Sequence, residues 1–170
     1  MRAAILVEGE SDRIAVEAVA ARRGRDLEAA GVLVVAVGGA HALERVLRKW
    51  TGARVAGLYD RGEERAVLRG LERVGVDRAG FFACDPDLEG ELVRALGIHG
   101  VEAVLDAQSE LESFRRLQRQ PAQRGRAPER QLARFFGGRS GNKLRYAVLM
   151  AAALPLERVP PAIAGLLRAV

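Results

Sequence analysis

AAILVEGESD, residues 3–12, contains the two local patterns that decide the fold of this chain. The apolar run Ala3–Val7 has no polar alternation, which is typical of a strand covered on both faces of its sheet. Gly9 then allows a sharp turn, and Ser11 is a suitable N-cap for a helix that has Asp12 in its first turn. The stretch therefore predicts a buried strand, a tight turn and a helix start, with Glu8 at the carboxyl end of the strand.

The same alternation continues through the first hundred residues. Strict succession of strand and helix indicates crossover connections, and hence a parallel sheet with helices on both faces. We predict an α/β fold with a four-stranded parallel sheet. Its strands are expected over Ala3–Val7, Val32–Val37, Arg54–Tyr59 and Gly80–Cys84, and its helices over Ser11–Arg23, Ala42–Trp50, Glu63–Val74 and Leu88–Leu96.

The remainder of the chain shows helical patterns and no convincing strand. The linker Gln120–Pro128 interrupts these patterns with two prolines and a glycine. Residues 1–100 are thus expected to form an α/β core, and residues 101–170 a helical C-terminal extension that packs on it as part of one structural domain. The helices are expected over Val101–Asp106, Glu110–Gln120, Pro128–Phe136, Ser140–Ala153 and Pro161–Ala169.

Composition narrows the functional classes. Nearly half of the 170 residues are apolar, so the chain is expected to be globular, and a net charge of +5 favours a polyanionic partner. Cys84 is the only cysteine, which rules out an internal disulfide and fits a cytoplasmic location. Polar residues from Gly9 onward argue against a signal peptide, and no apolar run is long enough to span a bilayer, so no membrane association is expected.

Carboxylates follow three of the four predicted strands. Glu8 follows the first strand, Asp60 ends the third, and CDPDLEGEL (residues 84–92) follows the fourth. The carboxyl ends of parallel strands meet at one edge of a sheet, where ligands bind. Carboxylates gathered there cannot all stay ionised without a cation, and an all-oxygen ligand set selects Mg²⁺, Mn²⁺ or Ca²⁺.

Taken singly, several of these acids have ordinary structural explanations. Asp12 would be stabilised by the dipole of the first helix, and Asp60 or Asp87 could cap the helix that follows it. Asp85 is harder to explain in this way, because it lies before Pro86 and outside the helix. The joint pattern therefore favours a metal site over a set of unrelated caps.

These motifs together resemble the topoisomerase–primase (TOPRIM) domain, and more narrowly the TOPRIM nuclease domain of the OLD (overcoming lysogenisation defect) endonucleases. RSGNKLRYA (residues 139–147) is similar to the C-terminal lysine motif of that family, so the resemblance extends over nearly the whole chain. It implies a Rossmann-like TOPRIM fold, a site for Mg²⁺ or Mn²⁺ that Ca²⁺ would also fill in a crystal, and catalytic roles for Glu8 and Lys143. The metal ligands that it implies are Glu8, Asp12, Asp60, Asp85, Asp87 and Glu89, with Asp87 and Glu89 the closer match within the third motif.

One position departs from the family pattern. The second acid of the family's Asp-x-Asp pair is Gly62 here, and the spacing of Glu63 and Glu64 does not match that of the missing acid. One of two metal positions is therefore in question. Two interpretations follow: a nuclease that hydrolyses DNA phosphodiesters with two metal ions, or a non-catalytic module that binds nucleic acid or a partner ATPase. Nucleotidyl transfer, as in primases, uses the same acids and ranks lower.

Basic residues suggest where nucleic acid would bind. Between Arg115 and Arg145 there is only one acid, Glu129, and Lys143 is one of two lysines against 25 arginines. A solvated helical surface would explain such a run, but the near absence of acids favours contact with phosphates. The candidate contacts to nucleic acid, DNA by the resemblance, are Arg115, Arg116, Arg119, Arg124, Arg126, Arg139 and Arg145. No phosphate-binding loop for ATP is present, so a separate ATPase is a candidate partner.

Overall fold

The computed structural model describes residues 3–170. Four parallel strands form the sheet in the order β2-β1-β3-β4. They are β1 (Ala3–Val7), β2 (Val32–Ala36), β3 (Arg54–Asp60) and β4 (Phe81–Cys84). Because the chain leaves β1 toward β2 on one side and returns to pair β3 on the other, the strand order reverses between β1 and β3. Ligands bind at such a switch point in parallel α/β sheets.

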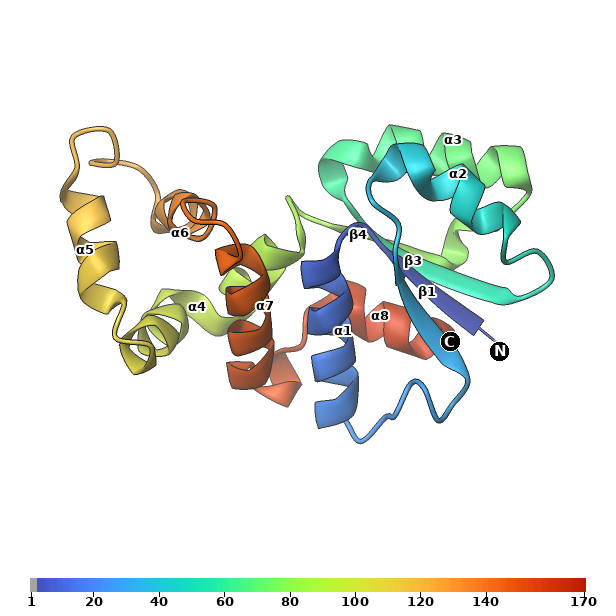
Figure 1. Cartoon of the computed structure of the whole chain (residues 1–170), viewed down its shortest axis with the longest axis horizontal. Coiled ribbons are helices and arrows are strands. Elements are labelled where there is room, and N and C mark those ends of the chain that lie inside the picture. Colours follow the sequence, from blue (N-terminus) through green and yellow to red (C-terminus); the bar gives the residue numbers. More distant parts are fainter. Residues whose placement is uncertain (1–2) are drawn as a thin grey trace.

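Helices cover both faces of the sheet (Figure 1). Alternate residues of β1 point to opposite faces, so that Ile5 belongs to one apolar core and Leu6 to the other. The Leu6 face is covered by α2 (Ala40–Arg48) and α3 (Glu64–Val74). The Ile5 face is covered by α1 (Glu10–Arg22), α8 (Pro161–Ala169) and the start of α4 (Leu88–Ala107). Both faces of β1 are therefore buried, as its uninterrupted apolar run predicted, whereas Leu33 of the edge strand β2 is 43% exposed.

The helical extension divides into two parts. Helix α7 (Asn142–Ala153) packs along α1, and α8 packs on β3 and β4, so both contact the α/β core. In contrast, α5 (Leu111–Arg119) and α6 (Pro128–Phe136) make their main contacts with α4, α7 and each other. Figure 1 shows these two helices projecting away from the sheet. The expectation of an extension packed on the core thus describes α7 and α8 better than α5 and α6.

The sequence predicted the fold class and most element boundaries correctly. The clearest difference concerns residues 88–107, where two predicted helices form the single element α4, interrupted at Gly97 with φ of 72°. Glycine adopts this left-handed conformation without a steric penalty, so the chain bends there and continues as helix. A second difference is that α1 begins at Glu10 with Gly9 as its N-cap, which places Ser11 inside the first turn. Among the described residues, no helix has both the length and the apolar character needed to cross a bilayer.

Candidate metal centre

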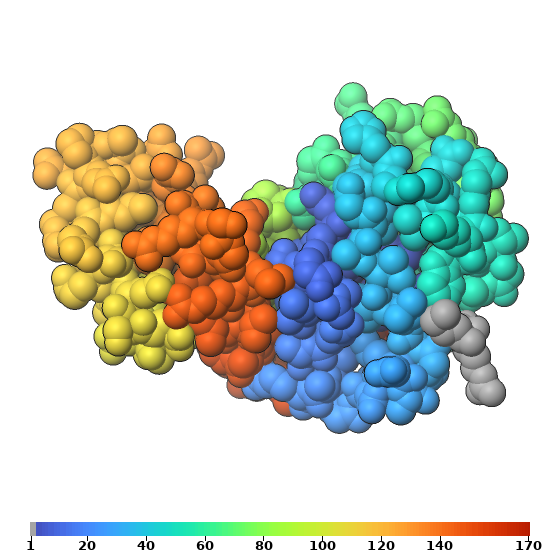
Figure 2. Space-filling model, in the orientation of Figure 1, coloured from blue at the N-terminus to red at the C-terminus, as the bar shows by residue number. Residues whose placement is uncertain are grey.

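A hollow of about 340 Å³ opens at the carboxyl ends of β1, β3 and β4. In Figure 2 the outline of the molecule dips between the helical extension and the α2–α3 side of the core, and the first residues of α1 surface at the base of this notch. We call this space the acidic hollow, after the five carboxylates that line it. They are Glu8, Asp12, Asp60, Asp87 and Glu89, and Lys143 lines the same space.

Glu8 and Asp60 line the acidic hollow from the adjacent strands β1 and β3: Glu8 directly follows β1, and Asp60 is the last residue of β3. The Oε2 atom of Glu8 is buried and, among the described residues, has no hydrogen-bond partner. Asp60 occupies the N-cap position of a short 3₁₀ turn, yet its side chain makes no capping hydrogen bond. Burial raises the pKa of Asp60 to about 8, and the charge and hydrogen bonding of Glu8, followed by the charges of Asp87 and Asp12, add to this effect. A simple cap therefore does not explain Asp60.

Asp12 and Asp87 each accept a hydrogen bond, through one carboxylate oxygen, from a backbone N–H group at the start of a helix. The backbone N–H of Gly9 donates to Oδ2 of Asp12 at 2.9 Å, and that of Gly90 donates to Oδ1 of Asp87 at 2.7 Å. These bonds fix the side chains at the ends of β1 and β4 and leave the second oxygen of each carboxylate available. Burial nevertheless raises the pKa of Asp12, and the nearby charge of Glu8 raises it further. The structural and ligand explanations of these two acids are therefore compatible.

Glu89 is paired with Lys143, the only basic side chain of residues 3–170 that lines the hollow. The Nζ atom of Lys143 lies 3.3 Å from Oε2 of Glu89, and the Lys143 side chain remains 59% exposed. Burial raises the pKa of Glu89, while Lys143 acts in the opposite direction. Burial would lower the pKa of Lys143, but the charge and hydrogen bond of Glu89 outweigh it and raise that pKa. A charged ammonium group thus stands at the rim, brought there by the first turn of α7.

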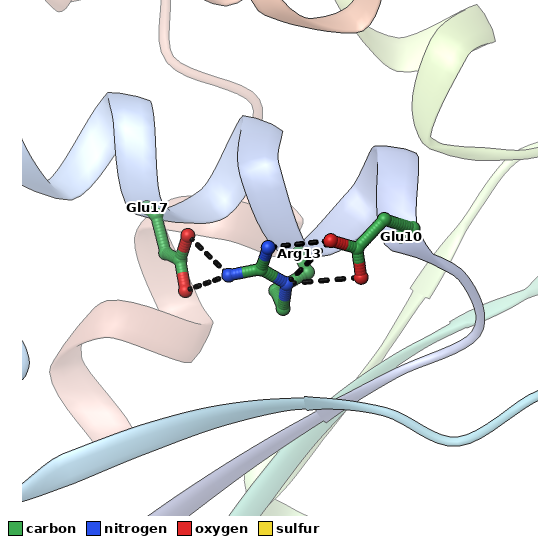
Figure 3. Close-up of polar contacts among 3 residues, drawn as sticks. All are labelled: Glu10, Arg13 and Glu17. Carbon is green, nitrogen blue, oxygen red and sulfur yellow. Dashed lines mark hydrogen bonds and ion pairs between the residues drawn. The ribbon is translucent and has the colours of Figure 1, made fainter. Parts of the chain in front are cut away.

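The other acids of these motifs lie elsewhere. Glu10 is held with Glu17 by Arg13 along α1, as Figure 3 shows. Asp85, predicted to lie with the ligands, does not line the hollow: its side chain is 64% exposed and faces Arg61 at 3.9 Å. Oε1 of Glu64 accepts bonds from Tyr59 and Arg61.

Glu63 does not replace the missing acid either. It lines a separate, mainly apolar pocket beneath α2 and α3. Neither Glu63 nor Glu64 therefore compensates for Gly62 in the acidic hollow.

Five further residues that the sequence did not assign to the site line the hollow. They are Gly9, Ser11, Gly38, Gly39 and Leu88. Gly38 and Gly39 have φ of 83° and 95°, a region that favours glycine, and the glycine pair at the end of a predicted strand was the available signal. The N–H of Gly38 donates to the carbonyl of Glu8 at 2.9 Å, so this loop also fixes the backbone of Glu8.

The donor set fits a divalent cation, although the side chains are not drawn together around one. All its candidate ligands are oxygens, a buried carboxylate oxygen lacks a partner, and burial with mutual repulsion raises the pKa of Asp60. Within residues 3–170, however, no group of three or more His, Cys, Asp or Glu side chains is already arranged to hold a metal ion. Binding would therefore require changes of side-chain rotamer, such as release of Glu89 from Lys143.

The predicted arginine track divides into paired and exposed side chains. Arg115 is bound to Glu102 at 2.9 Å, and Arg145 to Glu110 at 2.7 Å, so both are engaged in the fold. Five of the predicted contacts are exposed on the helical extension: Arg116, Arg119, Arg124, Arg126 and Arg139. Arg134, which is not among the predicted contacts, lies with Arg116 and Arg139 in a second pocket.

Comparison with known proteins agrees with this geometry. Residues 1–60 match the family model "Overcoming lysogenization defect protein-like, TOPRIM domain". Residues 1–60 are therefore similar to an OLD-like TOPRIM domain. The resemblance found in the motifs is thereby confirmed at the level of this domain. A search of curated protein sequences gives no significant match.

Solved structures extend the likeness over the full length of the chain. The C-terminal region of the Burkholderia pseudomallei OLD protein superposes with a TM-score of 0.73 at 22% identity, covering 99% of this chain and 96% of the other. The corresponding region of the Xanthomonas campestris pv. campestris OLD protein gives a TM-score of 0.75 at 23% identity, covering 99% and 91%. At such identities the likeness establishes the fold, which is that of the OLD-type TOPRIM region, helical extension included.

Proposed function

We propose that this OLD-like TOPRIM protein hydrolyses phosphodiester bonds of nucleic acid, with DNA as the expected substrate, in a reaction that depends on Mg²⁺ or Mn²⁺. The observation that carries the proposal is the buried, unpartnered Oε2 of Glu8 within a group of five carboxylates. An uncompensated buried carboxylate is unfavourable in a folded protein unless a ligand neutralises it. The family match to residues 1–60 supports metal-dependent cleavage as the use of such a site.

The carboxylates of the acidic hollow would act as ligands of the divalent ion. Glu8 and Asp60, on the two central strands, would hold a divalent ion, together with the free oxygens of Asp12 and Asp87. Glu89 would join them once released from Lys143. When bound, the metal would supply a water molecule of lowered pKa and a positive charge facing the scissile phosphate.

Lys143 would act on the substrate directly. Its ammonium group stands at the rim of the hollow on an exposed side chain, and Glu89 is its only partner there. When a phosphate enters, the ammonium can leave Glu89 and donate to the oxygens on which negative charge accumulates. Charge stabilisation of this kind acts in the transition state and therefore raises the turnover rate.

Purified protein should nick supercoiled plasmid in the presence of Mn²⁺ or Mg²⁺ and not in EDTA. Glu8→Gln should reduce the rate at least about 100-fold, because removing a charge-stabilising group from a catalytic site has effects of that order. Glu10→Gln is the matched control, since Glu10 lies two residues away but is held by Arg13. Metal-independent nicking, or equal rates for Glu8→Gln and Glu10→Gln, would contradict the proposal.

A second candidate is a binding module without turnover. It is favoured by Gly62, which removes one carboxylate that the family pattern contains, and by the lack of a preformed ligand cluster among the described residues. Titration calorimetry with Mn²⁺ separates the two candidates. Two bound ions favour the nuclease, whereas a single ion or none, together with no nicking, favours the module.

A further inference from the structure

A second polar pocket lies between α5, α6 and the first turn of α7. We call it the arginine pocket, and its polar side chains are those of Ser113, Arg116, Gln120, Arg134, Arg139 and Asn142. The three arginines come from three separate segments of the chain: Arg116 from α5, Arg134 from the last turn of α6, and Arg139 from the loop before α7. The fold therefore gathers positive charges that are not neighbours in sequence.

These arginines are not neutralised within the fold. Among residues 3–170, no carboxylate forms an ion pair with Arg116, Arg134 or Arg139, and Arg116 donates only to the hydroxyl of Ser113, at 3.0 Å. Glu110 lies near enough for Arg139 to contribute to lowering its pKa, but its two oxygens are bound by Arg145 and Tyr146. Arg115 and Arg145 are paired with acids, whereas the three pocket arginines, like the exposed Arg119 and Arg126 outside the pocket, have no carboxylate partner among the described residues. What distinguishes the pocket arginines is that they line one pocket.

The first turn of α7 adds hydrogen-bond donors to the same place. Asn142 is only 9% exposed, and no side-chain hydrogen bond of Asn142 occurs within the described part of the chain. Helix α7 begins after Gly141 with no side-chain cap and no acidic residue in its first turn. The positive end of the helix dipole thus lies beside the Asn142 side chain, which lines the arginine pocket.

The arginine pocket and the acidic hollow meet at this helix start. Asn142 lines the pocket and Lys143, the next residue, lines the hollow. Successive residues of an α-helix point about 100° apart, because one turn contains about 3.6 residues. Two anion-binding positions therefore lie on either side of one helical turn.

We propose that the arginine pocket binds a backbone phosphate of the same polynucleotide strand whose scissile phosphate lies at Lys143, an inference that rests on the proposed function. Guanidinium groups bind phosphate oxygens through paired, charge-assisted hydrogen bonds. Phe135, which is partly buried at the pocket wall, offers an aromatic surface for a base of that strand. The pocket would thus set the register of the strand relative to the metal centre.

The test compares two triple variants that remove the same charge from the helical extension. Arg116→Ala/Arg134→Ala/Arg139→Ala empties the arginine pocket, and Arg119→Ala/Arg126→Ala/Arg130→Ala removes three exposed arginines outside it. Binding of a fluorescent 20-nucleotide single strand is measured by anisotropy in EDTA, so that no cleavage is needed. Circular dichroism melting confirms that both variants fold. The pocket variant should bind at least about tenfold more weakly than the control variant, because removing a single charge-assisted hydrogen bond already has an effect of roughly this size.

The salt dependence of binding gives a second measure of the same site. Each arginine–phosphate interaction that a variant removes from a single strand should reduce the slope of log K against log salt by about 0.7. A larger reduction for the pocket variant than for the control supports a defined phosphate site. Equal weakening in both variants would overturn the proposal in favour of a diffuse basic surface.

Further outcomes separate this proposal from its alternatives. If mononucleotide or inorganic phosphate binding is lost in the pocket variant while oligonucleotide binding is unchanged, the pocket serves a small anion and the strand proposal fails. If the pocket variant loses oligonucleotide binding while the wild type nicks no DNA, the pocket stands and the nuclease proposal fails. If the wild type nicks DNA in a metal-dependent reaction but the two variants bind the oligonucleotide equally, the nuclease proposal stands and the pocket proposal fails.

Discussion

Carboxylates at two places in this molecule have opposite electrostatic surroundings. In the acidic hollow, burial and neighbouring acids raise the pKa of Asp60 to about 8, and Oε2 of Glu8 lacks a partner. Beside α7, hydrogen bonds from Tyr146 and Arg145 lower the pKa of Glu110 below its usual value. Both environments are at least partly buried, so burial does not explain why the pKa shifts have opposite signs. The difference is that Glu110 accepts hydrogen bonds from Tyr146 and Arg145, whereas Oε2 of Glu8 has no such donor among residues 3–170.

This contrast indicates what each place does. Glu110 connects the start of α5 to α7 through two donors, so its ionised form stabilises the fold. The acidic hollow has few donors for its five carboxylates, so ionisation there opposes folding until a cation binds. Removing a carboxylate charge from the acidic hollow should therefore stabilise the metal-free protein, and removing the charge of Glu110 should destabilise it.

The largest effect is expected from removing Lys143, whose ammonium group lines the hollow. Lys143→Ala should lower the single-turnover nicking rate at saturating Mn²⁺ about 100-fold, because a donor to developing phosphate charge contributes on that scale. Lys49→Ala, which removes the only other lysine, is the control for net charge. A rate for Lys143→Ala within a factor of about three of that control would show that Lys143 serves only to neutralise Glu89.

Replacing Glu110 should have the next largest effect, this time on stability. Glu110→Gln weakens the bonds from Arg145 and from the fully buried Tyr146, and should lower the free energy of unfolding by about 1–3 kcal/mol at pH 7. Since the pKa of Glu110 is lowered by folding, this stabilisation is present above the unfolded pKa and is lost as pH falls through the folded one. Urea titrations of both proteins should give stabilities that differ at about pH 7, above the carboxyl pKa, and converge as the pH falls to about 3, below its ordinary value.

Glu112→Gln provides the control for this comparison. Glu112 is exposed on α5 and forms no ion pair within the described residues. It should change the free energy of unfolding by less than about 0.5 kcal/mol at any pH. A Glu110→Gln protein as stable as this control would remove the basis for treating the two carboxylate environments as opposites.

The sequence was informative wherever local pattern determines structure. Unbroken apolar strands such as Ala3–Val7 predicted a sheet covered on both faces, and parallel topology then placed Glu8 and Asp60 on adjacent strands. Connectivity alone could not show that Asp85 turns outward to Arg61, because one residue after a strand end suffices to change the direction of a side chain. The assignment of these acids to metal stays a prediction.

Long-range partners were beyond sequence reasoning. Arg115 and Arg145 look identical to Arg116 and Arg139 in the basic run, yet Glu102 and Glu110 engage the first two. Those acids lie in α4 and just before α5, outside the basic run, so only the packing of α4 to α7 reveals the pairing. For the same reason Arg134 was overlooked, since its pocket is built from three separate segments.

Removing an acid from the hollow should stabilise the metal-free protein, the reverse of the effect at Glu110. Asp60→Asn relieves repulsion with Glu8 and Asp87 and should raise the free energy of unfolding in EDTA at pH 8 by about 1 kcal/mol, a value reduced because solvent screens a partly exposed group. Asp106→Asn, at an exposed position of α4, is the control. Destabilisation by Asp60→Asn would mean that the carboxylate is satisfied by contacts within the fold.

Adding an acid at the position that departs from the family pattern tests the contrast from the other side. A Cβ atom at Gly62 would meet no atom within 4 Å, so Gly62→Asp introduces a carboxylate beside Asp60 without a steric clash. We expect tighter Mn²⁺ binding by severalfold and a small loss of metal-free stability, about 0.5 kcal/mol, because another negative charge joins an uncompensated group. Gly62→Asn, which has the same shape without the charge, separates electrostatics from backbone effects. If calorimetry finds equal Mn²⁺ affinity in both variants, residue 62 points away from the acidic hollow, and its glycine has no bearing on how many ions the site holds.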